Sequence, residues 1–333
     1  MKIFVYEFVT GGGLAGKELS PGLVHEADLM LRSVLADLGD VPGVACLTAR
    51  DPRLPPIPGS DILTPLAGES PLDLYRRGIA MTEWVWPTAP ESGGVLEQLS
   101  RAVIDGHRNL LGSRPDAVSL TASKYATAMH LARAGIPVVP TFTVDSTELL
   151  AHDGRWVVKP DDGAGADDII VVPDHDSART LLAARGRTHI MQPWLEGVPA
   201  SLSLLCCDGK ARIITCNRQK IRVTDGRIVL SGIHVNGEKA RAMELAPLGE
   251  EIAAAVPGLW GYVGVDLMVT ARGPMVLEIN PRLTTSWCGL RHALGVNPAE
   301  WIVDLARTGV LPCPPFPTAG GTFHLHPEPV GVR

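Results

Sequence analysis

The sequence lacks the features of membrane, secreted and disulfide-stabilised proteins. No run of about 18 or more apolar residues occurs, so no segment is long enough to span a bilayer. The opening residues Met1–Tyr6 lead directly into a predicted strand, without the charged head and small-residue cleavage site of a signal peptide. The six cysteines show neither a CxxC pair nor the spacing of metal ligands. These absences predict a cytoplasmic protein with reduced, inert thiols.

Several enzyme motifs are also missing. The Gly-rich loop Gly11–Gly13 follows the first predicted strand, but it does not read G-x-G-x-x-G, and no acidic residue closes a second strand about 20 residues later. The P-loop G-x-x-x-x-G-K-S/T is absent, and so are G-x-S-x-G and a clear Cys/His arrangement. A net charge of −6 argues against nucleic-acid binding as a main role. A dehydrogenase built on the Gly-rich loop stays open as a disfavoured alternative.

What the sequence does contain is enough apolar material for two or three compact lobes, with 45% hydrophobic residues in a chain of 333. Strand-type and helix-type patterns alternate up to about residue 115, which predicts a small α/β domain with a parallel sheet. The strands expected there are 3–9, 44–47, 82–86 and 109–112, and the expected helices are 26–39, 74–80 and 95–105.

The most informative stretch is Gly264–Arg282, whose alternating apolar residues predict two strands joined by a tight turn. Period-two geometry places Glu278 and Asn280 on one face of the second strand, and hairpin pairing brings Asp266 beside them. Two carboxylates and an amide oxygen form a hard ligand set that suits Mg²⁺ on nucleotide phosphates. Arg282 would point its donors at the same phosphates or at a developing oxyanion.

A second phosphate-binding candidate lies at residues 156–168. Trp156–Pro160 is a predicted strand with Lys159 near its end, followed by a loop that contains Gly163 and Gly165. A lysine at a strand end supplies a point charge for the α- and β-phosphates, and glycines let the loop fold over a triphosphate and present backbone N–H groups. The sequence therefore predicts that this segment binds a triphosphate.

Five motifs, in this order, resemble those of the ATP-grasp superfamily, and the resemblance covers roughly residues 115–310. They are the helix-opening Lys124, K-P-x-x-G-x-G from residue 159, Q-P-W-L-E-G from residue 192, N-R-Q from residue 217, and Asp266 with E-I-N-P-R from residue 278. The resemblance implies that Lys124 contacts nucleotide phosphate. It also implies three parts, namely a pre-ATP-grasp α/β domain (1–115), a lid subdomain (116–195) and a C-terminal subdomain with the metal site (196–333).

The resemblance further implies an adenine-binding hinge between two ATP-grasp lobes, with the nucleotide between them. Pro193 would supply a carbonyl, for which its missing N–H is no obstacle, and Leu195 would supply an N–H. Trp194 lies between them. Gln192 and Glu196 are candidates for the amine edge of adenine and for the ribose. Many members carry a second acid just after the E-G, which this sequence lacks, so the ribose contact stays open.

The chemistry implied by the resemblance is transfer of the ATP γ-phosphoryl group to a carboxylate, followed by attack of an amine on the acyl phosphate. Positioning and charge neutralisation by Mg²⁺, or alternatively Mn²⁺, and by Lys159, Arg218 and Arg282 would carry catalysis. Within the superfamily, V-Y-E-F-V-T-G-G-G, E-G-V-P-A-S-L-S and N-R-Q are most similar to the tyramine–L-glutamate ligases of methanofuran synthesis and their tyrosine-using methylofuran counterparts. The expected product is a γ-glutamyl amide of tyrosine or tyramine.

Several residues are candidates for binding the amino-acid substrates. Glu7 stands at the carboxyl end of the first strand, where open α/β sheets bind ligands, and it is either a partner of the substrate amine or a solvated strand end. Gly12 and Gly13 would let the backbone approach a small ligand. Asn217 is a further substrate candidate. His234 lies in a polar, glycine-bearing segment and is a general-base candidate, although a structural role is favoured for it.

Two alternatives to this ligase stay open. One is another ATP-grasp amino-acid ligase in the manner of D-alanine–D-alanine ligase, and the other is a nucleotide-binding regulator without turnover. The expected partners are small-molecule amino acids, with no nucleic acid and no membrane, and a homodimer is left open. The loop Gly163–Asp168 is expected to close over bound nucleotide and to become protected from protease.

Overall fold

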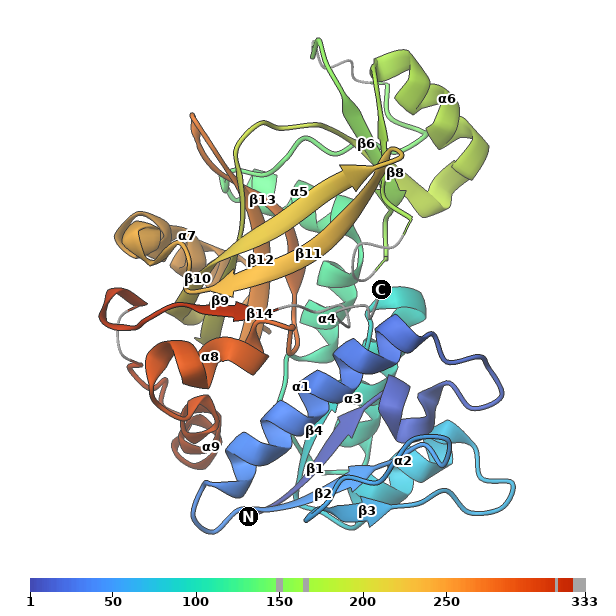
Figure 1. Ribbon diagram of the computed structural model, residues 1–333, viewed down its shortest axis with the longest axis vertical. Coiled ribbons are helices and arrows are strands. Elements are labelled where there is room, and N and C mark those ends of the chain that lie inside the picture. Colours follow the sequence, from blue (N-terminus) through green and yellow to red (C-terminus); the bar gives the residue numbers. More distant parts are fainter. Residues whose placement is uncertain (148–151, 164–167, 315–316, 326–333) are drawn as a thin grey trace, which may run out of the picture.

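The computed structural model describes residues 1–147, 152–163, 168–314 and 317–325. It contains two sheets, and Figure 1 shows the N-terminal sheet below the larger one. Among the helices of the described ranges, none is long and apolar enough to cross a membrane. Gly165, a predicted phosphate-loop residue, lies outside the described residues, as does most of the loop expected to close over nucleotide.

The N-terminal sheet is parallel and has the strand order β3-β2-β1-β4-β5. Helices connect most of its strands, which confirms the predicted α/β domain. Because β1 is the central strand, its carboxyl end at Glu7 opens in the middle of the sheet edge. The elements are β1 (Lys2–Glu7), α1 (Pro21–Gly39), β2 (Ala45–Ala49), β3 (Asp61–Leu63), α2 (Pro71–Ala80), β4 (Trp84–Thr88), α3 (Val95–Asp105) and β5 (Asn109–Leu110).

Each face of this sheet has its own core. Phe4 and Tyr6 of β1 pack with apolar residues of α2 and α3. Ile3 and Val5 point to the opposite face, as the period of two requires, and pack with α1. That second core does not stop at the domain edge, because Trp287 and other residues from the C-terminal part belong to it.

The larger sheet is antiparallel at every described pairing and has the order β13-β12-β9-β10-β11-β7-β6-β8, with β14 paired to β11. Asp208 and Gly209 both have positive φ, as a tight two-residue turn between β9 and β10 requires. The strands are β6 (Trp156–Pro160), β7 (Ile170–Val172), β8 (His189–Pro193), β9 (Val198–Cys207), β10 (Lys210–Thr224), β11 (Arg227–Val235), β12 (Gly261–Thr270), β13 (Gly273–Asn280) and β14 (Phe323–Leu325).

Helices surround this sheet and join it to the N-terminal domain. Figure 1 shows α6 beside β6 and β8 at the far end from the N-terminus, α7 along β9 and β10, and α8 and α9 near α1. The helices are α4 (Pro115–Ala122), α5 (Lys124–Arg133), α6 (His175–Arg185), α7 (Ala242–Ala255), α8 (Trp287–Leu294) and α9 (Pro298–Thr308).

Helix α4 is not predicted from the sequence pattern. Pro115 occupies its first position, which is typical of a helix start. Ser123, extended at φ −94° and ψ 118°, separates it from α5. The Ser123 hydroxyl accepts a hydrogen bond from the Ala126 N–H at 3.0 Å, so this serine caps α5. The short α4 therefore places Lys124 at the first turn of α5.

Candidate active site

The hairpin of β12 and β13 carries two facing carboxylates. Asp266 pairs directly with Glu278, so both side chains lie on one face of the sheet. Asn280 follows on the same face, with its Nδ2 atom 3.5 Å from the Asp266 Oδ2 atom. Gln219 of β10 donates to the other Asp266 oxygen at 2.9 Å. The three predicted metal ligands are thus brought together.

The two carboxylates have opposite pKa shifts. Burial raises the pKa of Asp266, and the neighbouring Glu278 raises it further. Burial also acts against the charged form of Glu278, but Lys124 and Lys159 outweigh it and hold the pKa of Glu278 below its usual range. Two buried carboxylates that repel each other are stabilised by a bound cation, and the amide of Asn280 adds a further oxygen. The donor set therefore fits a divalent metal such as Mg²⁺.

This donor set is small. Within the described ranges, no group of three His, Cys, Asp or Glu side chains is placed to hold a metal. A hard cation bound by two carboxylates and an amide would keep open positions for waters or phosphate oxygens, as Mg²⁺ does in nucleotide sites. The six predicted inert cysteines are free thiols and contribute nothing to this site.

Two lysines lie next to the carboxylates. The Lys124 Nζ atom is 3.3 Å from the Glu278 Oε2 atom and also donates to the carbonyl of Gly163. Lys159, at the end of β6, is buried and lines the same cavity. Burial, aided by the positive charge of Lys124, lowers the pKa of Lys159 to about 8. Both predicted phosphate-binding lysines therefore face the carboxylate pair, from different elements.

Asp161 fixes the position of Lys124 relative to Lys159. Its carboxylate accepts from the Tyr125 N–H at 2.8 Å and from the Ser123 hydroxyl at 2.6 Å, which are groups at the N-terminus of α5. Its carbonyl accepts from the Lys124 N–H at 3.0 Å. Helix N-termini favour such an acceptor because their first N–H groups have no partner within the helix. Asp161 therefore ties the start of α5 to the end of β6.

The predicted hinge also lines the cavity. Gln192 and Pro193 end β8, and they line the cavity together with Trp194 and Leu195. The Gln192 side chain donates to Thr141 at 2.8 Å, so its amide is held inside the protein. The Leu195 N–H donates to no group in the described ranges, and it is therefore available to a ligand.

Glu196 lies at the rim rather than in the cavity. Its carboxylate accepts from the Trp194 indole N–H at 2.9 Å and from Arg155 at 3.2 Å, and its side chain is largely exposed. The Arg155 guanidinium also stacks over the Trp194 ring, 4.4 Å from its centroid. These contacts hold the outer side of the hinge. If Glu196 contacts adenine or ribose as predicted, it can do so only at the exposed rim of the cavity.

Arg282 is held by a residue that the sequence pattern does not reveal. Its Nε and Nη2 atoms donate to the two carboxylate oxygens of Glu91, at 2.9 and 3.0 Å. Although burial disfavours the charged guanidinium, Glu91 together with Glu26 and Glu278 raises the pKa of Arg282. Glu91 lies between β4 and α3, so this bidentate pair joins the N-terminal domain to the end of the β12–β13 hairpin.

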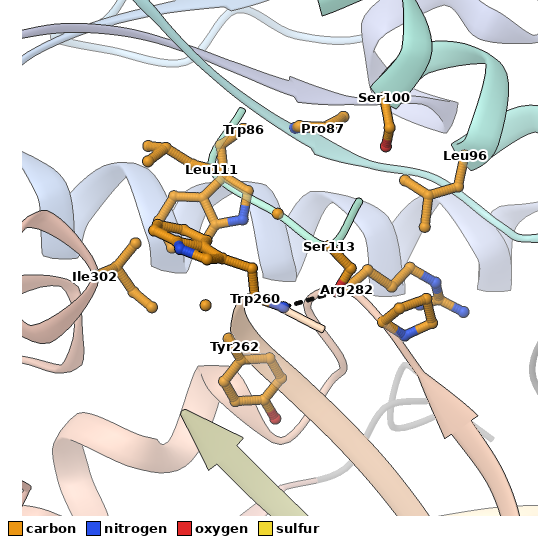
Figure 2. A pocket seen from close by; sticks show the side chains of 13 residues that line it. Trp86, Pro87, Leu96, Ser100, Leu111, Ser113, Trp260, Tyr262, Arg282 and Ile302 are labelled. Carbon is orange, nitrogen blue, oxygen red and sulfur yellow. Dashed lines mark hydrogen bonds between the residues drawn. The ribbon is translucent and has the colours of Figure 1, made fainter. Parts of the chain in front are cut away.

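A small cavity lies beside Arg282, and it is structural. Figure 2 shows residues of the N-terminal domain facing residues of the C-terminal part around it. The Trp260 N–H donates to the Ser113 hydroxyl across this junction at 3.2 Å. The cavity measures about 10 Å³, which is room for about one water molecule. It is too small for a substrate, and its walls instead fix the base of the Arg282 side chain.

Two sequence predictions are corrected by position. Arg218 is on the opposite face of β10 from Gln219, where its exposed side chain contacts Glu238 at 3.4 Å, so it does not face the cavity. Asn217 is fully buried and donates to Ser203 at 3.1 Å, so its amide lies beneath the cavity floor. The His234 ring packs against the His324 ring outside the cavity lining, which agrees with the structural role favoured for it over that of a general base.

The Gly-rich loop has a structural explanation. Gly12 has φ +95°, a conformation that favours glycine. A Cβ atom on Gly13 would lie 2.3 Å from the Phe8 ring and 2.6 Å from the Phe8 carbonyl. Neither glycine lines the main cavity. The predicted approach of these glycines to a ligand is therefore corrected, because the turn itself requires them.

Glu7 lines the cavity, but its own turn uses its carboxylate. One oxygen accepts from the Val9 N–H at 3.1 Å, and the other accepts from the N–H and the hydroxyl of Thr10, each at 2.7 Å. Burial raises the pKa of Glu7 against these hydrogen bonds and against the attraction of Arg282. Glu7 therefore shapes the end of β1 more directly than it offers a free acceptor.

A single cavity of about 740 Å³ unites these parts. It runs from the hinge, past Lys159 and the carboxylate pair, to the end of β1 and one face of α1. That volume accommodates a nucleotide together with small substrates. Two family models match the chain in succession, a pre-ATP-grasp domain over residues 44–118 and an ATP-grasp domain over residues 121–286.

The chain belongs to the ATP-grasp superfamily. The superfamily resemblance expected from the five motifs is confirmed. A "Probable alpha-L-glutamate ligase" of Legionella pneumophila is 27% identical over 264 residues, which are 74% of this chain and 84% of that protein. The tyramine–L-glutamate ligase of Methanocaldococcus jannaschii is 27% identical over 228 residues, which are 67% of this chain and 62% of that protein.

Solved ATP-grasp structures share the fold. An ATP-grasp superfamily protein from Archaeoglobus fulgidus aligns with a TM-score of 0.67 at 22% identity, covering 94% of this chain and 90% of that one. The D-alanine–D-alanine ligase of Bacillus anthracis, complexed with ATP, aligns with a TM-score of 0.63 at 16% identity, covering 92% and 97%. ATP-grasp proteins bind ATP and Mg²⁺. This chain is an ATP-dependent carboxylate–amine ligase of that superfamily.

Proposed function

We propose that this ATP-grasp ligase joins the side-chain carboxylate of L-glutamate to the amine of tyrosine or tyramine, in synthesis of a methanofuran- or methylofuran-type cofactor. The observation that carries the ligase site is the Asp266–Glu278 pair flanked by Lys124 and Lys159 in a cavity that continues to the N-terminal domain. The glutamate and amine assignment is supported by the relatives' names and by the sequence similarity to tyramine–L-glutamate ligases.

Each wall of the cavity has a proposed task. Asp266, Glu278 and Asn280 would hold Mg²⁺, which when bound neutralises phosphate charge and acts as a Lewis acid. Lys124 and Lys159 lie where they would neutralise the remaining phosphate charge. The hinge at 193–195 would hold adenine through main-chain groups, with the Leu195 N–H as one donor.

The proposed reaction has two steps. A glutamate carboxylate oxygen attacks the γ-phosphorus of ATP, and the bond to ADP breaks. The amine nitrogen then attacks the acyl carbon and a C–N bond forms. The bond between the acyl carbon and the phosphate oxygen breaks, and phosphate leaves with its electron pair. The ammonium loses two protons in total, of which one leaves on the phosphate and one passes to solvent. Charged side chains that are already oriented in the cavity would lower both barriers mainly by positioning and electrostatic stabilisation.

The test is ADP release from Mg-ATP with L-glutamate and either tyramine or tyrosine, with the amide product identified by mass spectrometry. We expect release that requires both substrates and falls at least about 100-fold in Glu278→Gln, since a metal ligand and a partner of Lys124 are lost together. Glu244→Gln, an exposed acid on α7, is the matched control and should keep full activity. ADP release that depends on a different carboxylate or amine would contradict the substrate assignment.

A further inference from the structure

The part of the cavity next to the N-terminal domain is formed by one face of α1. Leu23, Glu26, Ala27 and Met30 all line it, at the spacing i, i+3, i+4 and i+7 that places residues on one side of a helix. This face is apolar apart from Glu26. Leu23 is 47% exposed, although it is a large apolar residue, and it stands at the cavity edge. The cavity wall there combines one carboxylate with an apolar surface.

Three carboxylates surround the single guanidinium of Arg282 in this region. Both Glu91 oxygens accept hydrogen bonds from Arg282, and Glu7 and Glu26 interact with Arg282 electrostatically. One positive charge among three acids leaves the region able to accept a cation. The cations that line the cavity from the described residues are Arg282 and Lys159, and Lys159 lies at the metal end.

Of these three carboxylates, Glu26 is the one with an oxygen that accepts no hydrogen bond from the described residues. Both Glu91 oxygens accept from Arg282, and both Glu7 oxygens accept from Val9 and Thr10. The Thr285 hydroxyl donates to the Glu26 Oε1 atom, which fixes the orientation of the carboxylate. The Glu26 Oε2 atom accepts no hydrogen bond from the residues that the structure describes. An oriented carboxylate with one open oxygen in a substrate cavity suits an ammonium group.

On the basis of the proposed function, we propose that Glu26 binds the ammonium group of the amine substrate. The apolar face of α1 around it then binds the body of that substrate, so the site selects a primary amine on an apolar, aromatic-sized frame. Glu26 replaces Glu7 as the amine partner, because the Glu7 oxygens are occupied within its own turn. Glu26, Arg282 and Glu278 line the same cavity, so this subsite is continuous with the metal end.

The experiment separates binding of the amine from activation of the carboxylate. Hydroxylamine is a small, uncharged nucleophile at neutral pH, and it traps an activated glutamate as a hydroxamate without needing an ammonium site. Glu26→Gln should raise the KM for tyramine or tyrosine about 10- to 100-fold, as expected for the loss of a charged hydrogen bond, while hydroxamate formation and the KM values for ATP and glutamate stay unchanged. Leu23→Ser should raise the amine KM several-fold in the same pattern.

Glu18→Gln is the matched control, because Glu18 is an exposed acid of the preceding loop that does not line the cavity. It should behave as the wild type. An unchanged amine KM in Glu26→Gln, or an equal loss of hydroxamate formation, would overturn the assignment and indicate a structural role for the Glu26–Thr285 hydrogen bond. If the wild type forms neither amide nor hydroxamate, the proposed function fails and this inference fails with it.

Discussion

Arg282 and Glu91 are 191 positions apart in the sequence, yet two N–H donors on one edge of the guanidinium bind both oxygens of the Glu91 carboxylate. Both side chains are nearly buried. Removing either partner of such a pair leaves an uncompensated charge in a poorly solvated place, which costs several kcal/mol. The pair therefore couples the end of β13 to the N-terminal domain.

A double-mutant cycle of Glu91→Gln and Arg282→Gln in chemical denaturation should give a coupling free energy of about 2 kcal/mol or more. The exposed pair Arg212–Glu250, with N–O distance 3.3 Å and side chains 51% and 59% exposed, is the matched control. Its coupling should stay below about 1 kcal/mol, because solvent screens it. Equal coupling in the two cycles would show that the buried pair has no special energetic role.

For single residues, the sequence predicts the local strand geometry well, but it predicts poorly which side chains from distant segments bind each other. Strand alternation brings Asp266, Glu278 and Asn280 together as expected, because all three belong to one hairpin. The N-R-Q motif does not predict which of its side chains faces the cavity, and alternation along β10 turns Gln219 toward the cavity and Arg218 away from it. Glu91 has no local pattern at all, because its partner comes from a distant part of the chain.

Helices α1 and α8 meet through a buried acid. Asp37 of α1 accepts from the Trp287 indole N–H at 3.0 Å and contacts Arg291 at 3.4 Å. Burial raises the pKa of Asp37 to about 6, against the attraction of Arg291. The unfolded chain releases this proton near pH 4, so between about pH 4 and pH 6 the folded protein holds a proton that the unfolded protein has lost. The contribution of Asp37 to the free energy of unfolding is therefore fully present below about pH 4 and is lost as the pH rises through about 6.

Asp37→Asn should remove this loss, since the amide oxygen still accepts from Trp287. The free energy of unfolding of the variant relative to wild type should increase by about 2 to 3 kcal/mol between pH 4 and pH 7. Urea unfolding at a series of pH values measures this difference. Asp40→Asn, which removes an exposed partner of the same Arg291, is the control and should show little pH dependence. Parallel pH profiles for Asp37→Asn and wild type would contradict the prediction.

Elements with strong periodicity are predicted close to their observed bounds, as α3 shows, because its apolar spacing is regular and Gly94 and Gly106 flank it. Helix α4 is missed because it is short and is separated from α5 by only the extended Ser123. Strand β3 is missed because it follows a proline-rich connection and is stabilised by pairing with β2 rather than by its own pattern.

For the molecule as a whole, the decisive feature is a core that crosses from the N-terminal sheet to the C-terminal helices. Trp86 packs edge-on against Trp287 with ring centroids 5.5 Å apart, and Trp287 packs against Tyr262 at 5.4 Å. Ile3 and Val5 belong to the same cluster. The order of the five ATP-grasp motifs predicts which lobes exist, but this interface depends on residues that no motif contains.

The N-terminal and C-terminal parts should therefore unfold together. Calorimetry of the ligand-free protein should show one transition with calorimetric and van't Hoff enthalpies that agree. Trp287→Ala should lower the free energy of unfolding by about 3 to 5 kcal/mol, because it empties a fully buried ring site. Two separate transitions in the wild type would show that the lobes are energetically independent despite the shared core.

The shared core also imposes an order on synthesis. The strands of the N-terminal sheet are all made once residue 110 has been translated, but the face carrying Ile3 and Val5 is completed by Trp287. At ordinary translation speeds the intervening residues take on the order of ten to thirty seconds. Throughout that interval the nascent chain would carry a finished sheet whose face is packed by α1 but still lacks the cover of Trp287 and its neighbours, and the apolar surface left exposed is of the kind that chaperones bind.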